Sequence, residues 1–329
     1  MVLCTKMSII LPLKEDLNKI NDIINTYEYD KYIKLPFYNT KQAKKYLFDK
    51  IKDFYLKNPD TTILIESNGE IVGLICYEKS VWDTNHFGFN VASIKYLLTK
   101  PMSYMEECNI KSDLLNNFEE WCKKEKIRFI NTKIDSGDYS TIHVLEKFGF
   151  NYMSTVITTL LDCRDIKDFK FGLILRNLKD NEIDVIARMA ENIFKENRFY
   201  LDKRFDKKKA SEIHGEWIRN RYRQNPYSVY VLEDKGDIIG FCNILIEDLS
   251  DYFGLKIAYL DLAGISQKYI GKSYDFSLYA GMINLLKKKV DIIDTDFITR
   301  NIPVFNIYTK FGFRFAYSKI ALHKWRSIS

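Results

Sequence analysis

The sequence lacks several features that would assign it to well-defined classes of protein. Its six cysteines form no Cys-x-x-Cys pair and its four histidines show no close ligand spacing, so no metal site is expected. Residues 1–14 are too short and too soon charged for a secretory signal, and no apolar run approaches the roughly 18–20 residues of a membrane span. We therefore expect a cytoplasmic protein with reduced, buried thiols and no membrane contact.

The chain also has no long basic stripe and no alternation of basic and aromatic residues, which argues against a nucleic-acid partner. Its net charge of +6 mildly favours an anionic ligand such as a phosphate-bearing one. Hydrophobic residues make up 46% and charged residues 29%, a globular composition, and the 15% of aromatics is typical of a chain that lines a ligand cleft. The 329 residues exceed what one core usually covers, so two domains are expected.

A six-residue segment occurs twice. Leu145–Phe150 reads LEKFGF and Tyr308–Phe313 reads YTKFGF, 163 positions later and close to half of the 329 residues. Solenoid repeats have periods of roughly 20–50 residues, so this distance indicates a duplicated domain.

Each half is predicted to contain the same order of elements. The first half is expected to form the strands and helices Met7–Leu13, Leu17–Asn25, Thr40–Leu56, Thr61–Ser67, Ile71–Tyr77, Val91–Thr99, Ile110–Lys126, Phe129–Ile134, Ser140–Phe148 and Asn151–Leu161, with a hairpin turn at Asn68-Gly69. The second half is expected to form Gly172–Arg176, Asn181–Lys195, Lys207–Gln224, Ser228–Glu233, Ile238–Ile246, Lys256–Ile265, Tyr274–Lys289, Asp291–Phe297, Val304–Phe311 and Arg314–His323, with a turn at Lys235-Gly236. A charged linker near Cys163–Lys170 divides domains 1–165 and 166–329.

The order β-α-α-β-β-β-α-β-α-β, followed by a Gly-Phe turn, resembles the GNAT acyltransferase superfamily, and the whole chain resembles a tandem pair of such domains. Three stretches are similar to the TDP-fucosamine acetyltransferases and related N-acyltransferases of nucleotide-linked 4-amino-4,6-dideoxy sugars: the loop Trp82–Phe89, the segment Asn197–Tyr200 with Trp217-Ile218, and the core Ile265–Trp325.

This resemblance implies an α/β fold of two GNAT-like domains, each a mixed, mainly antiparallel twisted sheet flanked by helices. It implies transfer of an acyl group from acyl-CoA to the amine of a nucleotide-linked sugar such as a dTDP sugar, without a metal, by a monomer or homodimer. A GNAT acting on an aminoglycoside, a protein N-terminus or an aminoacyl-tRNA remains an alternative, as does a non-catalytic acyl-CoA-binding module.

The donor site is expected at the start of helix Tyr274–Lys289. Unpaired amides at a helix N-terminus suit the pyrophosphate of coenzyme A, and small residues let the backbone approach it. The family pattern Arg/Gln-Gly-x-Gly-x-Gly/Ala is matched in part here, with departures at two positions. The matching run is Lys268, Tyr269, Ile270, Gly271, Lys272 and Ser273.

The same offset of 163 moves Gly271 to Cys108 in the first half. The loop Pro101–Asn109 contains no glycine, and its Glu106 and Glu107 would repel a pyrophosphate. The first domain is therefore expected not to bind acyl-CoA and instead to shape the acceptor site.

By resemblance, Asn301 would bind the pantetheine arm, Phe305 would pack near the donor and Tyr308 would protonate the departing sulfur. A phenol, with a pKa of about 10, suits a thiolate of similar basicity. The equivalent residues of the first half are Asp138 and Leu145, and leucine has no proton to give. The alternatives are a core aromatic for Tyr308 and a helix cap for Asn301.

The general base is less defined, with Asp261, Asp83, His86 or a bound water as candidates. The acceptor is expected in a cleft between the domains. Its predicted ligands are Trp82, Arg198 and Tyr200, and Arg198 would pair with the nucleotide diphosphate. The alternatives are an idle loop histidine for His86 and a surface arginine for Arg198.

Overall fold

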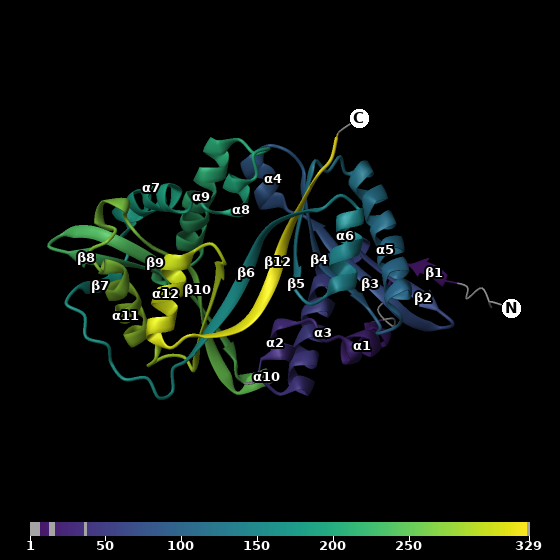
Figure 1. The fold of residues 1–329 in the computed structure, drawn as a ribbon, viewed down its shortest axis with the longest axis horizontal. Coiled ribbons are helices and arrows are strands. Elements are labelled where there is room, and N and C mark those ends of the chain that lie inside the picture. Colours follow the sequence, from purple (N-terminus) through teal and green to yellow (C-terminus); the bar gives the residue numbers. More distant parts are fainter. Residues whose placement is uncertain (1–6, 13–16, 36–37, 328–329) are drawn as a thin grey trace. The chain divides into compact units, whose positions relative to one another are not determined.

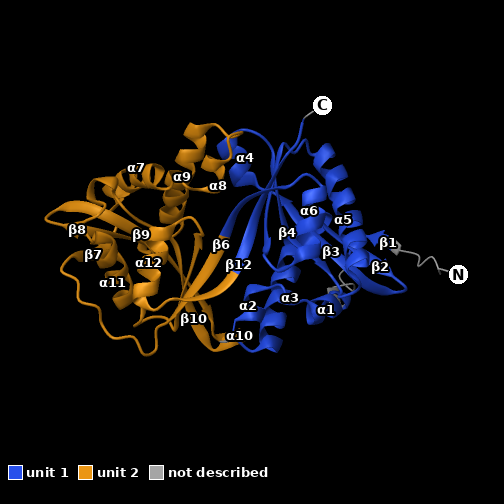
Figure 2. Cartoon of the chain, in the orientation of Figure 1, with its two compact units in different colours: residues 1–155, 318–329 blue, residues 156–317 orange. Residues whose placement is uncertain are grey.

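A computed structural model describes residues 7–12, 17–35 and 38–327, which divide into two compact units. The first unit comprises residues 1–155 and 318–329, and the second comprises residues 156–317 (Figure 2). The observed division falls after residue 155, whereas the predicted boundary is residue 165. The first unit also includes the last residues of the chain, 318–329.

The first unit contains a sheet in the order β1-β2-β3-β4-β5-β12 (Figure 1). Helices cover both of its faces: α1 and α3 pack on one core, and α5 and α6 on another. Its elements are β1 Met7–Ile10, α1 Leu17–Thr26, α2 Lys31–Lys34, α3 Thr40–Lys57, β2 Thr62–Ser67, β3 Glu70–Lys79, α4 Val81–Phe87, β4 Val91–Thr99, α5 Tyr104–Lys124, β5 Phe129–Asp135 and α6 Tyr139–Lys147.

The second unit repeats this plan with the order β6-β11-β10-β9-β8-β7. Here α7 and α9 cover one face, and α11 and α12 the other. Its elements are β7 Ile174–Asn177, α7 Ile183–Ile193, α8 Arg198–Leu201, α9 Lys207–Gln224, β8 Val229–Asp234, β9 Asp237–Leu249, α10 Ser250–Phe253, β10 Leu255–Ile265, α11 Tyr274–Leu286, β11 Ile292–Ile298 and α12 Ile302–Phe311.

Two long strands explain the unexpected division. The last strand, β12 (Arg314–Trp325), pairs through Lys319–Trp325 with β5 of the first unit, and β6 (Asn151–Asp162) pairs through Val156–Asp162 with β11 of the second. Each half of the chain therefore gives its last strand to the other unit. A linear reading of the repeat misses this exchange, because strand partners depend on tertiary structure.

The predicted fold class is confirmed: each sheet has one parallel pair, β4/β5 or β10/β11, and its other assigned pairs are antiparallel. Both predicted hairpin turns have positive φ at their two central residues, Asn68-Gly69 (55° and 83°) and Lys235-Gly236 (51° and 88°), the conformation that tight hairpins require. The stretch Trp82–Phe89, predicted as a loop, instead forms most of helix α4, which ends at Gly88 in the left-handed conformation.

Candidate active site

Two parallel strands separate in the middle of the second unit. β10 and β11 are paired only up to Leu260 and Thr295, whereas β10 continues to Ile265 and β11 to Ile298. A β-bulge marks the same point, because the pairing of β10 with β9 skips Asp261. Beyond this point the facing backbone groups of the two strands do not pair with each other, so the gap suits an extended polar ligand.

Tyr308 lies where these strands separate. Its hydroxyl is 3.0 Å from Thr295 Oγ1, and Thr295 in turn donates to the Leu260 carbonyl at 3.4 Å. Only 4% of Tyr308 is exposed. Burial raises the pKa of Tyr308, while hydrogen bonds with Thr295 and Tyr279 oppose that rise. The phenol is therefore protonated at neutral pH, the state a general acid needs, and it is also part of the core.

Two further predicted donor residues lie on the first turns of α12. Asn301 caps the helix, since its Oδ1 accepts from the Val304 amide at 3.4 Å, so the predicted cap is confirmed. Phe305 is 36% exposed and stacks on Phe315 with ring centroids 5.0 Å apart. Their roles toward the donor remain predictions.

The segment between β10 and α11 ends in exposed residues 270–273, three of which have free backbone donors. Among the residues that the structure describes, none accepts from the amides of Gly271, Lys272 or Ser273, and Ser273 does not cap α11 with its side chain. Gly271 and Ser273 have positive φ, at 82° and 57°. Successive free amides at a helix start form an anion-binding concavity.

Tyr269 anchors this loop, and its own hydroxyl and amide donate to other groups of the protein. Its ring is buried, its hydroxyl donates to Asp237 Oδ2 at 2.8 Å, and its amide donates to the Ser266 carbonyl. The Nζ atoms of Lys268 and Lys272 lie 4.9 and 5.6 Å from the centre of this ring. The two lysines thereby bring positive charge to the loop. Ile270 is exposed.

Asp261 is held by two donors on the face of the sheet that α9 covers. Its Oδ2 accepts from Arg221 Nε at 2.9 Å and from Asn243 Nδ2 at 3.0 Å. The guanidinium of Arg221 also lies 5.8 Å from the ring of Trp217. To act as a general base, Asp261 would have to take up a proton on a carboxylate that Arg221 already binds. That role remains a prediction.

The first unit contains the same strand separation without the same chemistry. β4 and β5 are paired only up to Ile94 and Thr132, and Thr132 Oγ1 donates to the Ile94 carbonyl at 3.0 Å. The residue equivalent to Tyr308 is Leu145, which is fully buried. The side chain of Leu145 has no hydroxyl for proton transfer.

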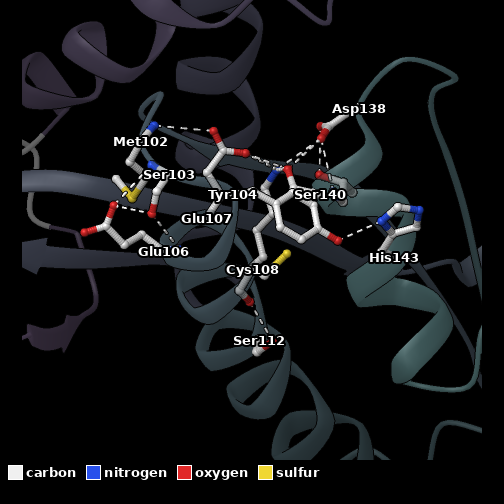
Figure 3. A network of polar contacts seen from close by, with 12 residues as sticks. Met102, Ser103, Tyr104, Glu106, Glu107, Cys108, Ser112, Asp138, Ser140 and His143 are labelled. Carbon is white, nitrogen blue, oxygen red and sulfur yellow. Dashed lines mark hydrogen bonds and ion pairs between the residues drawn. The ribbon is translucent and has the colours of Figure 1, made fainter.

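The start of α5 is closed by the protein's own carboxylates (Figure 3). Glu106 accepts from the Ser103 amide at 3.1 Å, Ser103 Oγ accepts from the Glu106 amide at 3.4 Å, and Glu107 accepts from the Met102 amide at 3.4 Å. The amides of Met102, Ser103 and Glu106 are thus occupied, and two carboxylates bring negative charge to the start of the helix.

One comparison made from the sequence is wrong in detail. Cys108 is not the loop counterpart of Gly271, because it lies inside helix α5. The connection from β4 to α5 is residues 100–103, whereas that from β10 to α11 is residues 266–273. A fixed offset cannot follow a loop whose length differs between the two units.

The other predicted residues are distributed over two short helices, one in each unit. In the first unit Trp82, 39% exposed, stacks on His86 with ring planes 5° apart, and Asp83 lies in the first turn of α4. In the second unit Arg198 lies 4.7 Å from the ring of Phe199, and the Nζ of Lys207 lies 4.8 Å from that of Tyr200. A shared acceptor cleft remains a prediction.

Four residues at the strand separation were not found from the sequence: Arg221, Asn243, Tyr279 and Thr295. The repeat contains a signal for one of them, because Thr132 and Thr295 are 163 positions apart and each ends a parallel pairing. The other three have no comparable signal, since they approach the site from different elements.

Comparison with known proteins supports this architecture. No protein-family model matches the sequence. A GCN5-related N-acetyltransferase from Sphaerobacter thermophilus is similar in structure over 97% of this chain and 95% of that chain, with a TM-score of 0.65 and 11% identity. A tandem GNAT protein from the clavulanic acid biosynthesis pathway is similar over 98% of this chain and 100% of that one, with a TM-score of 0.54 and 11% identity.

The chain has the tandem GNAT fold. In sequence it is 21% identical to the spore coat polysaccharide biosynthesis protein SpsD of Bacillus subtilis (strain 168), over 264 residues that make up 78% of this chain and 86% of that protein.

The described residues show three further properties. They contain no group of three or more His, Cys, Asp or Glu side chains placed to hold a metal ion. No helix among them is both long and apolar enough to cross a membrane. Cys76, Cys108, Cys122, Cys163 and Cys242 are buried free thiols, and Cys4 lies outside the described residues.

Proposed function

We propose that this protein is an N-acyltransferase that moves an acyl group from acyl-CoA to the amine of a nucleotide-linked 4-amino-4,6-dideoxy sugar, most simply a dTDP sugar. The second unit would carry the reaction. The observation that carries the proposal is the position of the Tyr308 hydroxyl at the separation of β10 and β11, on a unit whose open amide loop follows β10.

The donor would bind along the gap between these strands. Its pyrophosphate would accept from the amides of Gly271, Lys272 and Ser273, with Lys268 and Lys272 supplying positive charge. The pantetheine arm would extend toward Tyr308 past Asn301, and Phe305 would pack beside it. The first unit would bind no donor, because carboxylates cap the start of α5.

The proposed chemistry uses the groups at the donor end. The neutral amine attacks the thioester carbonyl, the carbon–sulfur bond breaks, and the thiolate takes the proton of the Tyr308 hydroxyl. Asp261 lies one residue beyond Leu260, next to the strand separation, and is our first candidate to accept the amine's proton. Asp83 and His86 of α4 are the other candidates, directly or through water.

Two sequence similarities support the acceptor class. The stretch Trp82–Phe89 is similar to the signature of enzymes that acylate nucleotide-linked amino sugars, and the SpsD protein bears a polysaccharide biosynthesis name. Trp82 and Tyr200 would contact the sugar nucleotide, and Arg198 would pair with its diphosphate.

The test is a mass-spectrometric assay with acetyl-CoA and a panel of dTDP-4-amino-4,6-dideoxy sugars. The panel includes UDP sugars, an aminoglycoside, a peptide with a free N-terminus and aminoacyl-tRNA as competitors. We expect an acetylated dTDP sugar and its loss in Tyr308→Phe. Preferential acetylation of another amine would overturn the substrate class, and donor binding without any transfer would indicate a binding module.

A further inference from the structure

One arginine of the second unit has unused hydrogen-bond donors beside the strand separation. Arg221 lies in the last turn of α9 and donates through Nε to Asp261 Oδ2 at 2.9 Å. Its terminal nitrogens, Nη1 and Nη2, have no hydrogen bond to any residue that the structure describes. The side chain is 28% exposed, so these nitrogens are open to solvent. The N–H groups on Nη1 and Nη2 therefore remain for a ligand.

Two other arginines of this unit use more of their donors within the protein. Arg176 on β7 donates from all three of its nitrogens to two glutamates. Arg219 on α9 donates from Nε and Nη1 to three carboxylates. Arginine and carboxylate frequently pair through two parallel bonds. Arg221 makes only one, so its ion pair leaves the outer edge of the guanidinium open.

The guanidinium of Arg221 is held in place from two sides. Asp261 Oδ2 also accepts from Asn243 Nδ2 at 3.0 Å, and Asn243 Oδ1 accepts from Ser228 Oγ at 3.0 Å. Asn243 is fully buried and Ser228 is 3% exposed, so these hydrogen bonds fix the carboxylate from inside the unit. On its other side the guanidinium carbon lies 5.8 Å from the centre of the Trp217 ring. Because the side chain is already ordered, a ligand that binds it would cost little side-chain entropy.

Arg221 and the candidate acid belong to opposite faces of the sheet. Tyr308 is part of the core under α11 and α12, whereas Trp217, one turn before Arg221, packs on the core under α7 and α9. The ion pair of Arg221 reaches β10 at Asp261, directly after Leu260, the last residue of β10 that pairs with β11. With the donor on the face of Tyr308, the face of α9 remains for the acceptor.

We infer that Arg221 binds the diphosphate of the acceptor through Nη1 and Nη2 while its Nε stays on Asp261. This inference rests on the proposed function. The planar guanidinium matches the paired oxygens of a phosphoryl group. A 4-amino-4,6-dideoxy sugar has a methyl group at C6 and no acid, so the diphosphate is the only anionic group of a dTDP-linked acceptor. Because a diphosphate has two phosphoryl groups, it has room for Arg198 as well.

The experiment is a calorimetric titration of dTDP into protein saturated with coenzyme A, which occupies the donor site. Arg221→Gln removes the charge and the paired donors, and we expect the Kd for dTDP to rise about tenfold. Arg221→Lys keeps the charge without the planar fork and should give an intermediate Kd. The matched control is Arg223→Gln, which removes the same charge at an exposed position of the same helix and should leave the Kd unchanged.

Two results would overturn the inference: a wild-type Kd for dTDP in Arg221→Gln, or no binding of dTDP to the wild-type protein. The affinity of Arg221→Gln for coenzyme A shows whether its second unit is folded, and we expect it to equal that of the wild type. If that affinity is lost, Arg221→Lys decides, since it retains a cation for Asp261. A wild-type Kd for dTDP in Arg221→Lys would then overturn the inference.

The acetylation assay separates this inference from the proposed function. If dTDP binding depends on Arg221 but no dTDP amino sugar is acetylated, the inference stands and the proposed substrate is wrong. If Arg221→Gln acetylates the sugar with the wild-type KM, the inference fails and the proposed function stands. Binding through Arg221 together with acetylation of the sugar supports both.

Discussion

The two units contain the same strand separation and differ in what surrounds it. Thr132 and Thr295 end the parallel pairing in each unit and hydrogen-bond to the carbonyl across the gap. Beside them lie Leu145 in the first unit and Tyr308 in the second. The strand separation thus occurs with and without a phenol beside it. A single side chain on the following helix decides whether that phenol is present.

The helix starts differ in the same way. At the start of α5, Ser103, Glu106 and Glu107 accept from the amides of Glu106, Ser103 and Met102, after a connection of residues 100–103. α11 follows the longer connection 266–273 and leaves the amides of its loop without an acceptor among the described residues. The first unit supplies its own anions at this helix start, and we expect the second unit to receive an anion from the donor.

The largest expected effect comes from removing the exchanged strand. Deleting residues 318–329 removes the partner of β5 and the buried side chains of Ala321 and Leu322. We expect the first unit to lose its native fold, seen as loss of hydrogen-exchange protection across β4 and β5. Arg314→Ala, at an exposed position on the same strand, should leave protection intact. Native protection in the truncated chain would show that the exchange is dispensable.

Next in size is the buried charge cluster of the first unit. Lys111 and Asp138 are each 2% exposed in their side chains, with Nζ and Oδ1 3.1 Å apart. Lys111→Met leaves the carboxylate uncompensated, and we expect a loss of about 3–5 kcal/mol in the free energy of unfolding. Lys123→Met, which breaks an exposed pair on the same helix, should cost at most about 1 kcal/mol. Equal costs in urea unfolding would contradict this assignment.

Tyr308→Phe tests the chemical difference directly. We expect kcat to fall about a hundredfold, with KM for acyl-CoA unchanged, because general acids contribute roughly 10²–10⁴. Leu145→Met is the matched change in the first unit and should leave kcat within about twofold, since volume-conserving swaps are tolerated. Steady-state acetyl transfer measures both variants. Wild-type kcat in Tyr308→Phe would remove the chemical distinction between the units.

Gly271→Val tests the donor loop. Gly271 has a φ of 82°, which a β-branched residue adopts only with strain. We expect acyl-CoA affinity to fall by about tenfold, equivalent to about 1.4 kcal/mol, measured by calorimetry. Gly149→Val strains the first unit at the same φ of 82° and should leave the affinity unchanged. Intact affinity in Gly271→Val would place the donor elsewhere.

The smallest effect concerns His214, which lies buried against Phe194 and Trp217. Burial lowers the pKa of His214 from an ordinary 6.5 to about 4. The unfolded chain then binds more protons between these values, so this stability is present above pH 6.5 and lost as the pH falls toward 4.

Between pH 7 and 5.5 we expect about 1 kcal/mol of this loss, measured by urea unfolding. His214→Leu should remove that component of the pH dependence. His143→Gln, at an exposed site on the first unit, should retain it. An unaltered pH dependence in His214→Leu would show that the loss has another origin.

Local patterns predicted many elements to within a few residues. The hairpins at Asn68-Gly69 and Lys235-Gly236 follow from turn chemistry, and the buried helices from apolar periodicity. Helix α4 was missed because Trp82–Phe89 has a glycine near its end and aromatic residues without a clear apolar face. Cys108 was misplaced because a constant offset assumes equal loop lengths.

The sequence alone indicated the duplication, the GNAT-like order of elements and the contrast of Leu145 with Tyr308. Each of these is read from short segments, and comparing two such segments needs no knowledge of tertiary contacts. The exchange of β6 and β12 and the meeting of Tyr279, Thr295 and Tyr308 are different. They join segments far apart in sequence, and backbone pairing and side-chain packing across the folded units decide which groups meet.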